Sequence, residues 1–403
     1  MRLTTVWGTV LCSLVGTGGA QPSLPGEGTL APLTVLSFRG HTFSHGLRGL
    51  TAAGFKGAAV KSELVDLNEE DGWLRCLRIT YHLPPAAAGE LPDANVMVGT
   101  ELPGNVAALR VRFLDDGSAN QFALTVVDGS GERFCFGVAS LTKPGWRIVD
   151  VPLMQGASHW DGNNDAVLDY PLRLGAVTML RGRGDAEEFG AVYLDSVEAL
   201  CDFGSLPVVG LTSFAPGAPE RWESVAEACA GGVLDFADDP TQVDHPASRF
   251  TYQLAPAQGE GVVCAGITTA LDTPLEVPGT LLLDVFGDAG LNILTLEVTD
   301  AAGTRWRGPV NPFVIDWVGW RTVYLFTGGR AWRSSTPEEA GRAGPYPLRF
   351  RSIRLGPRGP WFNDSLMQGS ILLRDLRFAP GSLDVLATAA PQMTDVRDVP
   401  SAR

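Results

Sequence analysis

Residues 109–134 read LRVRFLDDGSANQFALTVVDGSGERF, and residues 281–306 read LLLDVFGDAGLNILTLEVTDAAGTRW. Each run contains a segment that alternates apolar with polar residues, NQFALTVVD in the first and NILTLEVTD in the second. Such alternation is typical of a β-strand with one buried face. Both segments end in an Asp-x-x-Gly turn. The two runs therefore predict the same strand and turn in two separate parts of the chain.

Four further pairs of segments extend this repeat, in the same order, through both halves of the chain. They are LRITYHLPP and SRFTYQLAP, GWRIVDVPL and GWRTVYLFT, YPLRL and YPLRF, and GAVYLDSVEAL and GSILLRDLRFA. A repeat of this length indicates whole domains rather than solenoid units. Regularly spaced strands with glycine-rich turns then predict an all-β fold of two tandem jelly-roll β-sandwich domains, at 33–203 and 204–380. The segment 220–231 is compatible with a short helix.

The composition agrees with short strands joined by turns, since the 403 residues include 48 glycines and 28 prolines. Residues 1–20 have the features of a secretory signal peptide, with Arg2 before an apolar stretch and a small-x-small site at Gly18 and Ala20. We expect a secreted, periplasmic or cell-surface protein with a leader at 21–32 and a poorly ordered tail at 381–403. No other segment approaches the ~20 apolar residues of a membrane span.

Charge and cysteine content narrow the class of partner. The net charge of −14 opposes binding to nucleic acid or polyanionic polysaccharides, which are themselves negatively charged. Five cysteines follow the predicted signal peptide, and an odd number cannot pair completely within one chain. We expect Cys229 and Cys264 to pair, because both lie in the second half in segments that could be neighbours. No histidine has zinc or triad spacing, and we predict no catalytic residue.

A polar loop in the first half, SHWDGNNDAVLDYPLR at 158–173, has the spacing of a cation site. Its oxygen-bearing side chains fall at the first, third, fifth and ninth places of a possible calcium loop and belong to Asp161, Asn163, Asp165 and Asp169. Calcium takes six to eight oxygen ligands, which an acidic loop can supply in part. Ala166 and Leu172 occupy places where such loops need Gly and a carboxylate. Bound calcium and Asx-rich turns are both compatible with this pattern.

Tryptophans are the second group of candidate site residues. Trp160 and Trp332 stand early in the same loop of each half, while Trp306 and Trp361 fall near turns of the second half. Aromatic faces suit the apolar faces of sugar rings, so these four are the predicted ligand-binding residues. A Trp in this loop could instead fill the edge of the sandwich. Trp146 and Trp320 recur within strands, and we assign them to the cores.

The Gly-Trp-Arg strand, the polar loop with an early Trp, the Pro-Leu pair and the closing strand of YLDSV type occur together in both halves. In these features the chain resembles galactose-binding-like β-sandwich domains, in particular the carbohydrate-binding modules of secreted glycoside-degrading systems. The resemblance implies jelly rolls that bind sugar on a concave strand face or in the end loops, often with a structural calcium. Closing strands of such modules often carry paired Asp, whereas the pairs here are Asp195-Ser196 and Arg374-Asp375.

Three classes of function are compatible with this sequence. The first is a secreted non-catalytic protein whose two modules bind a neutral or weakly charged glycan. The second is a structural or surface protein that binds another protein through the same fold. The third is a glycan lyase or hydrolase, although adjacent carboxylates such as Glu187 and Glu188 point to opposite faces of a strand. Fold alone does not choose among the three.

Overall fold

The computed structural model shows an all-β protein, so the predicted fold class is confirmed. Within the part of the chain that it describes, no helix is long and apolar enough to cross a membrane. The structure describes residues 30–38, 50–69, 72–85, 91–153, 157–202, 208–214, 222–227, 231–239, 241, 246–254, 264–269, 271, 273–330, 332–334, 340–341, 343–357, 365–381 and 394–398.

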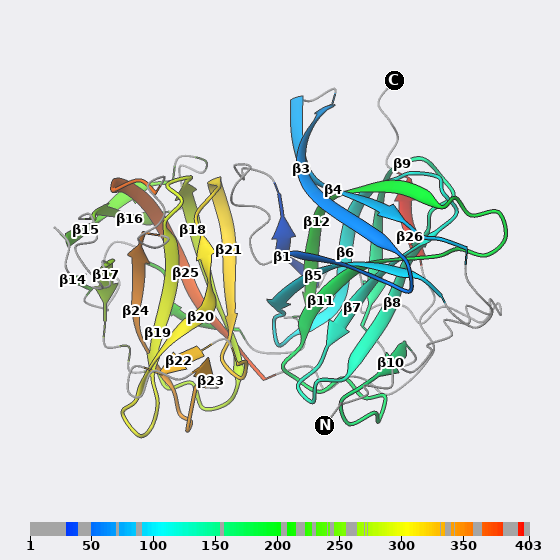
Figure 1. The fold of residues 1–403 in the computed structure, drawn as a ribbon. Coiled ribbons are helices and arrows are strands. Elements are labelled where there is room, and N and C mark those ends of the chain that lie inside the picture. The colour runs from blue at the N-terminus through cyan, green and yellow to red at the C-terminus, as the bar shows by residue number, and fades with distance from the viewer. Residues whose placement is uncertain are drawn as a thin grey trace, which may run out of the picture. The chain divides into compact units, whose positions relative to one another are not determined.

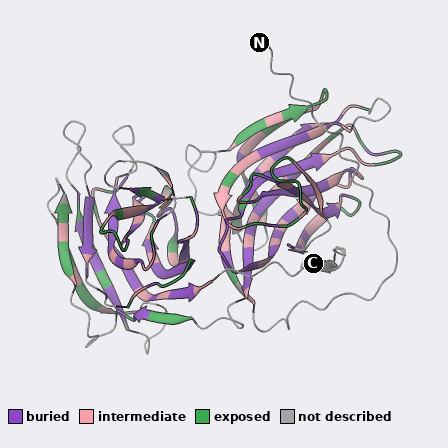
Figure 2. Ribbon diagram, turned by 90° about the horizontal axis from the view of Figure 1, so that it is seen from below, coloured by how far each residue is buried: buried purple, intermediate pink, exposed green. Residues whose placement is uncertain are grey.

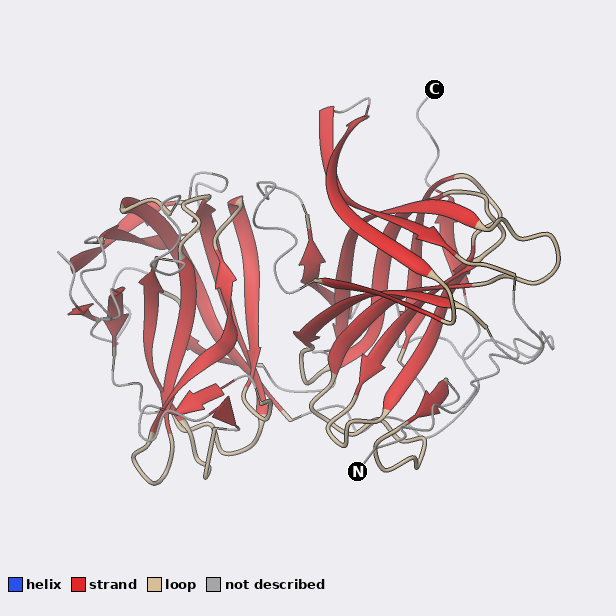
Figure 3. Cartoon of the chain, in the orientation of Figure 1, coloured by secondary structure: helices blue, strands red, loops and turns tan. Residues whose placement is uncertain are grey.

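The chain divides into two compact units (Figure 1). Unit 1 comprises the described residues up to Leu102, those from Val106 to Asp202, and strand β26 (Thr394–Asp398). Unit 2 comprises Pro103–Asn105 and the described residues between 203 and 382. Each unit contains two antiparallel sheets, as in a β-sandwich (Figure 3).

Unit 1 contains sheets A and B. The strands of sheet A are β1 (Leu30–Ser37), β3 (Ala59–Glu69), β4 (Gly72–His82), β6 (Val106–Asp115), β9 (Gly145–Pro152), β12 (Phe189–Asp202) and β26. Their order is β26-β9-β6-β12-β4-β3, and β1 pairs with β12. The strands of sheet B are β2 (Thr51–Phe55), β5 (Asp93–Glu101), β7 (Gln121–Val127), β8 (Arg133–Ser140), β10 (Ser158–Trp160) and β11 (Arg173–Leu180). Their order is β10-β8-β7-β11-β5-β2.

Unit 2 contains sheets C and D. The strands of sheet C are β13 (Val209–Thr212), β15 (Gly231–Asp238), β16 (Pro246–Gln253), β18 (Gly279–Asp288), β21 (Val318–Phe326) and β25 (Gln368–Pro380). Their order is β15-β16-β25-β18-β21, and β13 pairs with β25. The strands of sheet D, in the order β14-β17-β24-β19-β20-β22-β23, are β14 (Glu223–Glu227), β17 (Cys264–Thr268), β24 (Arg349–Gly356), β19 (Ile293–Thr299), β20 (Arg305–Val314), β22 (Trp332–Ser334) and β23 (Ala340–Gly341).

The two units share one topology. The order β9-β6-β12-β4-β3 of sheet A recurs as β21-β18-β25-β16-β15 in sheet C, and β10-β8-β7-β11-β5-β2 of sheet B recurs as β22-β20-β19-β24-β17-β14 in sheet D. The repeated sequence segments lie in these matched strands. The two runs that begin the sequence comparison form β6 and β7 in unit 1 and β18 and β19 in unit 2.

Alternating apolar residues from the matched strands form the interior of each unit. Figure 2 shows buried and less buried residues alternating along many strands. The inward positions of β6 and β18 are fully buried and belong to Leu109, Val111, Phe113, Leu281, Leu283 and Val285. Burial of such side chains stabilises the fold by roughly 1.5–3 kcal/mol each.

A buried tyrosine anchors the same corner in both units. The Tyr81 hydroxyl donates to Asp116 Oδ2 at 2.6 Å, and the Tyr252 hydroxyl donates to Asp288 Oδ2 at 2.7 Å. Burial is the main cause that raises the pKa of both tyrosines, so both stay protonated donors. A hydroxyl that is buried needs such a partner.

Three sequence predictions meet the structure here. The short helix at 220–231 is wrong where the structure describes that segment: residues 223–227 form strand β14, whose backbone pairs with β17 at the edge of sheet D. Strand β26 lies within the predicted tail and pairs with β9. Cys229 lies outside the described residues, and Cys264 is buried in β17, where Arg354 donates to its Sγ at 3.5 Å. The disulfide between them stays a prediction.

Candidate functional site

The predicted cation loop follows β10, at the edge of sheet B. Asn163 Nδ2 donates to Asp165 Oδ2 at 2.8 Å and to Asp169 Oδ2 at 3.3 Å, so these three side chains lie together. Asp161 instead forms an ion pair with Arg133, at 3.3 Å between Oδ2 and Nε. The structure thus brings together three of the four predicted metal ligands, whereas the fourth, Asp161, pairs with Arg133.

Glu132, which sequence reasoning missed, fixes this loop through hydrogen bonds to its backbone. Its side chain is fully buried and accepts the backbone N–H groups of Asp165 and Ala166, at 3.2 and 3.3 Å. His159 Nδ1 lies 2.6 Å from Glu132 Oε1. Asp128 similarly accepts the N–H of Asp169 at 3.2 Å. The only sequence signal for these partners was their place at the Asp-x-x-Gly turn before β8.

These hydrogen bonds account for the loop as turn chemistry. The described residues hold no group of three or more His, Cys, Asp and Glu side chains arranged around a common metal position. Oxygen ligands for calcium would come from Asn163, Asp165 and Asp169. Calcium in this loop stays a prediction.

The four predicted ligand-binding tryptophans have different surroundings. Trp332 is fully buried in the core of unit 2, with Nε1 donating to the Phe326 carbonyl at 3.1 Å, so its predicted role is wrong: no ring face is left for a sugar. Trp306 is half-buried and donates to Asp300 Oδ2 at 2.9 Å. Trp160 is half-buried on the edge strand β10. Trp361 lies outside the described residues.

A different set of aromatic side chains lies on the outer face of sheet A, the face turned away from the interior of unit 1. Along β12, Val192 and Leu194 are fully buried, so Phe189 and Tyr193 point to the outer face. Along β9, Arg147 and Val149 are buried, and Trp146 points outward. The outer face therefore carries the rings of Phe189, Tyr193 and Trp146.

Phe189 is an exposed aromatic residue of this face. Its side chain is 69% exposed, and its ring stacks on that of His82 with 4.4 Å between the centroids and 19° between the planes. His82 lies directly opposite on β4, with Nε2 at 3.8 Å from Glu188 Oε2. An apolar ring this exposed, and fixed by a stacked neighbour, offers its free surface to a ligand.

Tyr193 lies next along β12, under the guanidinium of Arg78. The Arg78 carbon Cζ is 5.8 Å from the centroid of the tyrosine ring, within the range of a cation–π contact. Arg78 Nη1 also lies 3.4 Å from Glu63 Oε1 on β3. A hydrogen bond from Lys61 is the main cause that lowers the pKa of Glu63, so this carboxylate is ionised at neutral pH.

Trp146 lies at the other end of the face and is clamped by polar groups. Arg112 Cζ is 4.4 Å from the centroid of its ring, and Arg112 Nη1 donates to the buried Asp195 Oδ2 at 2.7 Å. Trp146 Nε1 donates to Glu69 Oε1 at 3.0 Å. Strands β3 and β9 are at opposite ends of the shared order, so this bond requires sheet A to curve over its own outer face. The curvature of β3 and β4 is visible in Figure 1.

The outer face of sheet C in unit 2 keeps only part of this arrangement. Trp320 has Arg374 over its ring at 4.4 Å and donates to Asp239 Oδ1 at 3.0 Å. In the repeat, Gln368 and Leu372 replace Phe189 and Tyr193. Assignment of Trp146 and Trp320 to the cores was wrong, since both are half-buried on outer faces, where an arginine covers one side of each ring.

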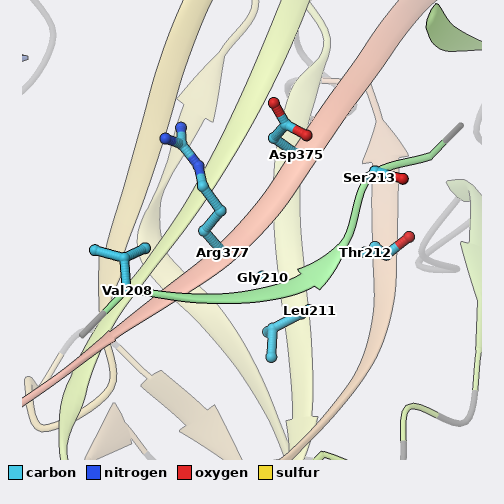
Figure 4. Close-up of a pocket in the computed structure, with 7 residues that line it drawn as sticks. All are labelled: Val208, Gly210, Leu211, Thr212, Ser213, Asp375 and Arg377. Atoms are coloured by element: carbon cyan, nitrogen blue, oxygen red, sulfur yellow. The ribbon is translucent and has the colours of Figure 1, made fainter.

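Unit 2 also has an open pocket of about 500 Å³ beside β25 (Figure 4). Strand β16 pairs with β25 up to Leu373 and β13 pairs from Leu376, so the edge of β25 is uncovered between them. Asp375 and Arg377 line the pocket with Val208 and residues of β13. Arg377 Nη2 already donates to Asp284 Oδ1 at 2.9 Å, and the described residues that line the pocket include no aromatic residue. It therefore offers less to a sugar than the outer face of sheet A.

No protein-family model and no curated protein sequence matches the chain. Among solved structures, it is similar to the family 11 carbohydrate-binding module of the cellulosomal cellulase Lic26A-Cel5E of Clostridium thermocellum, with 12% identity, a TM-score of 0.30, and coverage of 43% of this chain and 95% of that one. A structure of a family 11 module from Clostridium thermocellum in complex with a β-1,3-1,4-mixed-linked tetrasaccharide has 13% identity and a TM-score of 0.29, and the match covers 40% of this chain and 93% of that one. The ANX1 ectodomain from Arabidopsis thaliana has 10% identity and a TM-score of 0.18, and the match covers 78% of this chain and 91% of that one. Likenesses this slight carry no argument about function.

Proposed function

We propose that the outer face of sheet A binds a neutral or weakly charged glycan, and that the chain is a secreted, non-catalytic carbohydrate-binding protein. One observation carries the proposal: Phe189, Tyr193 and Trp146 stand on one curved strand face among charged hydrogen-bonding groups. Aromatic rings accept the apolar faces of sugar rings, and charged groups make strong hydrogen bonds with hydroxyls. The net charge of −14 favours an uncharged sugar over a polyanion.

The spacing of the rings favours an oligosaccharide over a single sugar. Phe189 and Tyr193 are four residues apart on one strand, a separation of about 13 Å at 3.3 Å per residue. Tyr193 and Trp146 are carried by strands separated by β6. A ligand that touches all three rings must therefore span more than one sugar unit.

The charged groups on this face are suited to holding a ligand. Glu63 pairs with Lys61 and Arg78, and Asp195 pairs with Arg112. Each of these carboxylates has a cationic partner that holds its position. Asp195 is fully buried, so it serves to orient Arg112. Fixed donors and acceptors reduce the entropy lost when a ligand binds, so we assign Glu63, Arg78 and Arg112 to recognition rather than to acid–base chemistry.

Glycan screening with matched variants tests the proposal. Phe189→Ala removes the exposed ring, and Phe236→Ala is its control, because Phe236 is 59% exposed on β15 of unit 2. We expect glycan affinity to fall about tenfold or more for Phe189→Ala, a loss of about 1.4 kcal/mol, and to be unchanged for Phe236→Ala. Loss on Trp160→Ala alone would move the site to the loop after β10. Capture of a specific protein partner without glycan binding would favour the protein-interaction alternative.

A further inference from the structure

The closing strands of the two units carry opposite charges at equivalent outer-face positions. On β12 these positions hold Asp195 and Glu198, and on β25 they hold Arg374 and Arg377. On the neighbouring strand the change of charge runs the other way: Arg112 on β6 corresponds to Asp284 on β18. The sequence repeat aligns these positions, and the registers agree at the pairs Phe113–Leu194 and Val285–Leu373. One step further along, a bulge places Ser196 opposite Arg112, whereas Arg374 lies opposite Asp284.

In unit 1, the closing strand supplies the anion. Asp195 is fully buried and accepts from Arg112 Nη1 at 2.7 Å. Glu198 lies opposite Arg110 in the register of β12 and β6. Arg110 also pairs with Asp150 on β9, at 2.7 Å between Nε and Oδ1. The anions of β12 thus face the cations of β6.

In unit 2, the closing strand supplies the cation. Arg377 Nη2 donates to Asp284 Oδ1 at 2.9 Å, and Arg374 Nε lies 3.9 Å from Asp284 Oδ2. Arg374 Nη1 also donates to the buried Asp239 Oδ2 at 3.0 Å. The cations of β25 thus face anions on β18 and at the end of β15.

The inward positions of the closing strands do not distinguish the two units. Val192 and Leu194 on β12 correspond to Ile371 and Leu373 on β25, and all four are fully buried apolar residues. Tandem domains with the same topology are prone to misassembly by exchange of equivalent elements during folding. Each closing strand is the central strand of its sheet, between β6 and β4 or between β18 and β16, so its misplacement would disrupt the whole sheet.

We propose that the reversed ion pairs prevent exchange of the closing strands between units, or between two copies of the chain. In sheet C, β12 would bring Asp195 beside Asp284 and Asp239. In sheet A, β25 would bring Arg374 and Arg377 beside Arg112 and Arg110. Like charges opposite one another destabilise a strand pair, and burial of an unpaired charge adds to the penalty. The native pairing is the arrangement in which every one of these charges meets its opposite.

Exchange of the ion-pair polarity in the full-length chain tests this device. The first variant carries Arg112→Asp with Asp195→Arg, and the second carries Asp284→Arg with Arg374→Asp. Each places the aspartate and the arginine as the other unit has them, where the arginine lies 4.4 Å over a tryptophan. Each also makes the two units alike. A third variant carries all four substitutions, which makes the units opposite again. All variants, and the parent chain with which they are compared, also carry Asp239→Asn and Arg377→Gln, because Asp239 and Arg377 would otherwise meet like charges in the second variant.

The readout is the yield of native monomer after dilution from urea, measured by size-exclusion chromatography with light scattering and by near-ultraviolet circular dichroism. We expect each double variant to give about twofold or more less monomer, with swapped dimers or misassembled chains, and the quadruple variant to recover. Recovery separates the device from local damage, because the quadruple variant contains every substitution of both doubles. Doubles that refold like the parent chain would overturn the proposal, as would a quadruple variant no better than the worse double.

Discussion

Unit 1 and unit 2 share a strand order but not an outer face. Inside, the matched strands carry apolar residues at the same positions, as in Val111 and Leu283. Outside, Phe189 and Tyr193 of unit 1 become Gln368 and Leu372 in unit 2. The interior is constrained by close packing, whereas the outer face is free to change. Features that differ between the outer faces are therefore the better guide to function.

The features that both outer faces keep serve the fold. Trp146 and Trp320 each have an arginine at 4.4 Å over the ring and a carboxylate 3.0 Å from Nε1. This shared clamp joins the first strand of the order to residues from its opposite end, so it holds the curvature of the sheet. In the proposed site the clamp also fixes the Trp146 ring, and Phe189 and Tyr193 are the aromatic residues of that site that unit 2 lacks.

Trp332 gives the largest expected effect, because it occupies the same loop as Trp160 but a different environment. Trp332 is fully buried and Trp160 is half-buried at a sheet edge. Trp332→Ala should lower the free energy of unfolding by about 3–5 kcal/mol, and Trp160→Ala by about 1–2 kcal/mol. Urea unfolding of the full-length chain measures both. Equal losses would mean that the two tryptophans have equivalent packing after all.

The next largest difference is expected between the carboxylates of the two clamps, Asp239 in unit 2 and Glu69 in unit 1, in how much each stabilises the fold. Asp239 accepts from Trp320, Thr241 and Arg374, so Asp239→Asn should cost about 2 kcal/mol through the lost charge. Glu69→Gln should cost less than about 1 kcal/mol, because a glutamine oxygen can still accept the Trp146 Nε1–H. The same unfolding assay compares them. A larger loss for Glu69→Gln would show that the curvature of sheet A depends on charge at that position.

The lowered pKa of Asp239 predicts that the stability of unit 2 depends on pH. Burial raises the pKa of Asp239, but hydrogen bonds from Thr241 and Trp320 and the charge of Arg374 outweigh it and lower the pKa to about 2. A carboxylate with a lowered pKa in the folded state stabilises the fold above its unfolded pKa, and this stability is lost as the pH falls toward 2. Between about pH 5 and about pH 2, the melting temperature should decline less for Asp239→Asn than for the parent chain. Identical declines would contradict the assignment.

Much of the fold followed from sequence because one alternating pattern occurs twice. NQFALTVVD and NILTLEVTD became β7 and β19, and the Gly-Trp-Arg segments became β9 and β21. Alternation identifies the buried face of a strand. It does not reveal strand order, and only the order β9-β6-β12-β4-β3 brings Trp146, Tyr193 and Arg78 to one face.

The candidate tryptophans show the same limit. Position in a loop predicted the same environment for Trp160 and Trp332, but burial depends on tertiary packing around each ring. The helix expected at 220–231 failed for a similar reason: pairing of β14 with β17 overrode a weak local pattern. The loop at 158–169 could be recognised as polar, but its buried partners Glu132 and Asp128 lie in a distant segment.

Calcium should have the smallest effect on stability. Asp161 already pairs with Arg133, and the N–H groups of the loop already bond to Glu132 and Asp128. Addition of calcium to the metal-stripped chain should therefore shift the melting temperature by no more than about 1 °C, which corresponds to a fraction of a kcal/mol. A larger rise that Asp165→Ala abolishes would instead favour the cation prediction for this loop.

Glycan affinity of the double variant Phe189→Gln, Tyr193→Leu tests the central claim most directly, because it gives unit 1 the residues that unit 2 has at these positions. Isothermal titration with the best glycan from the screen, together with a melting curve, separates binding from folding. We predict that affinity falls by about a hundredfold, roughly 2.7 kcal/mol, while the melting temperature changes little. Unchanged affinity in a folded variant would contradict the account and place any glycan site elsewhere in the chain.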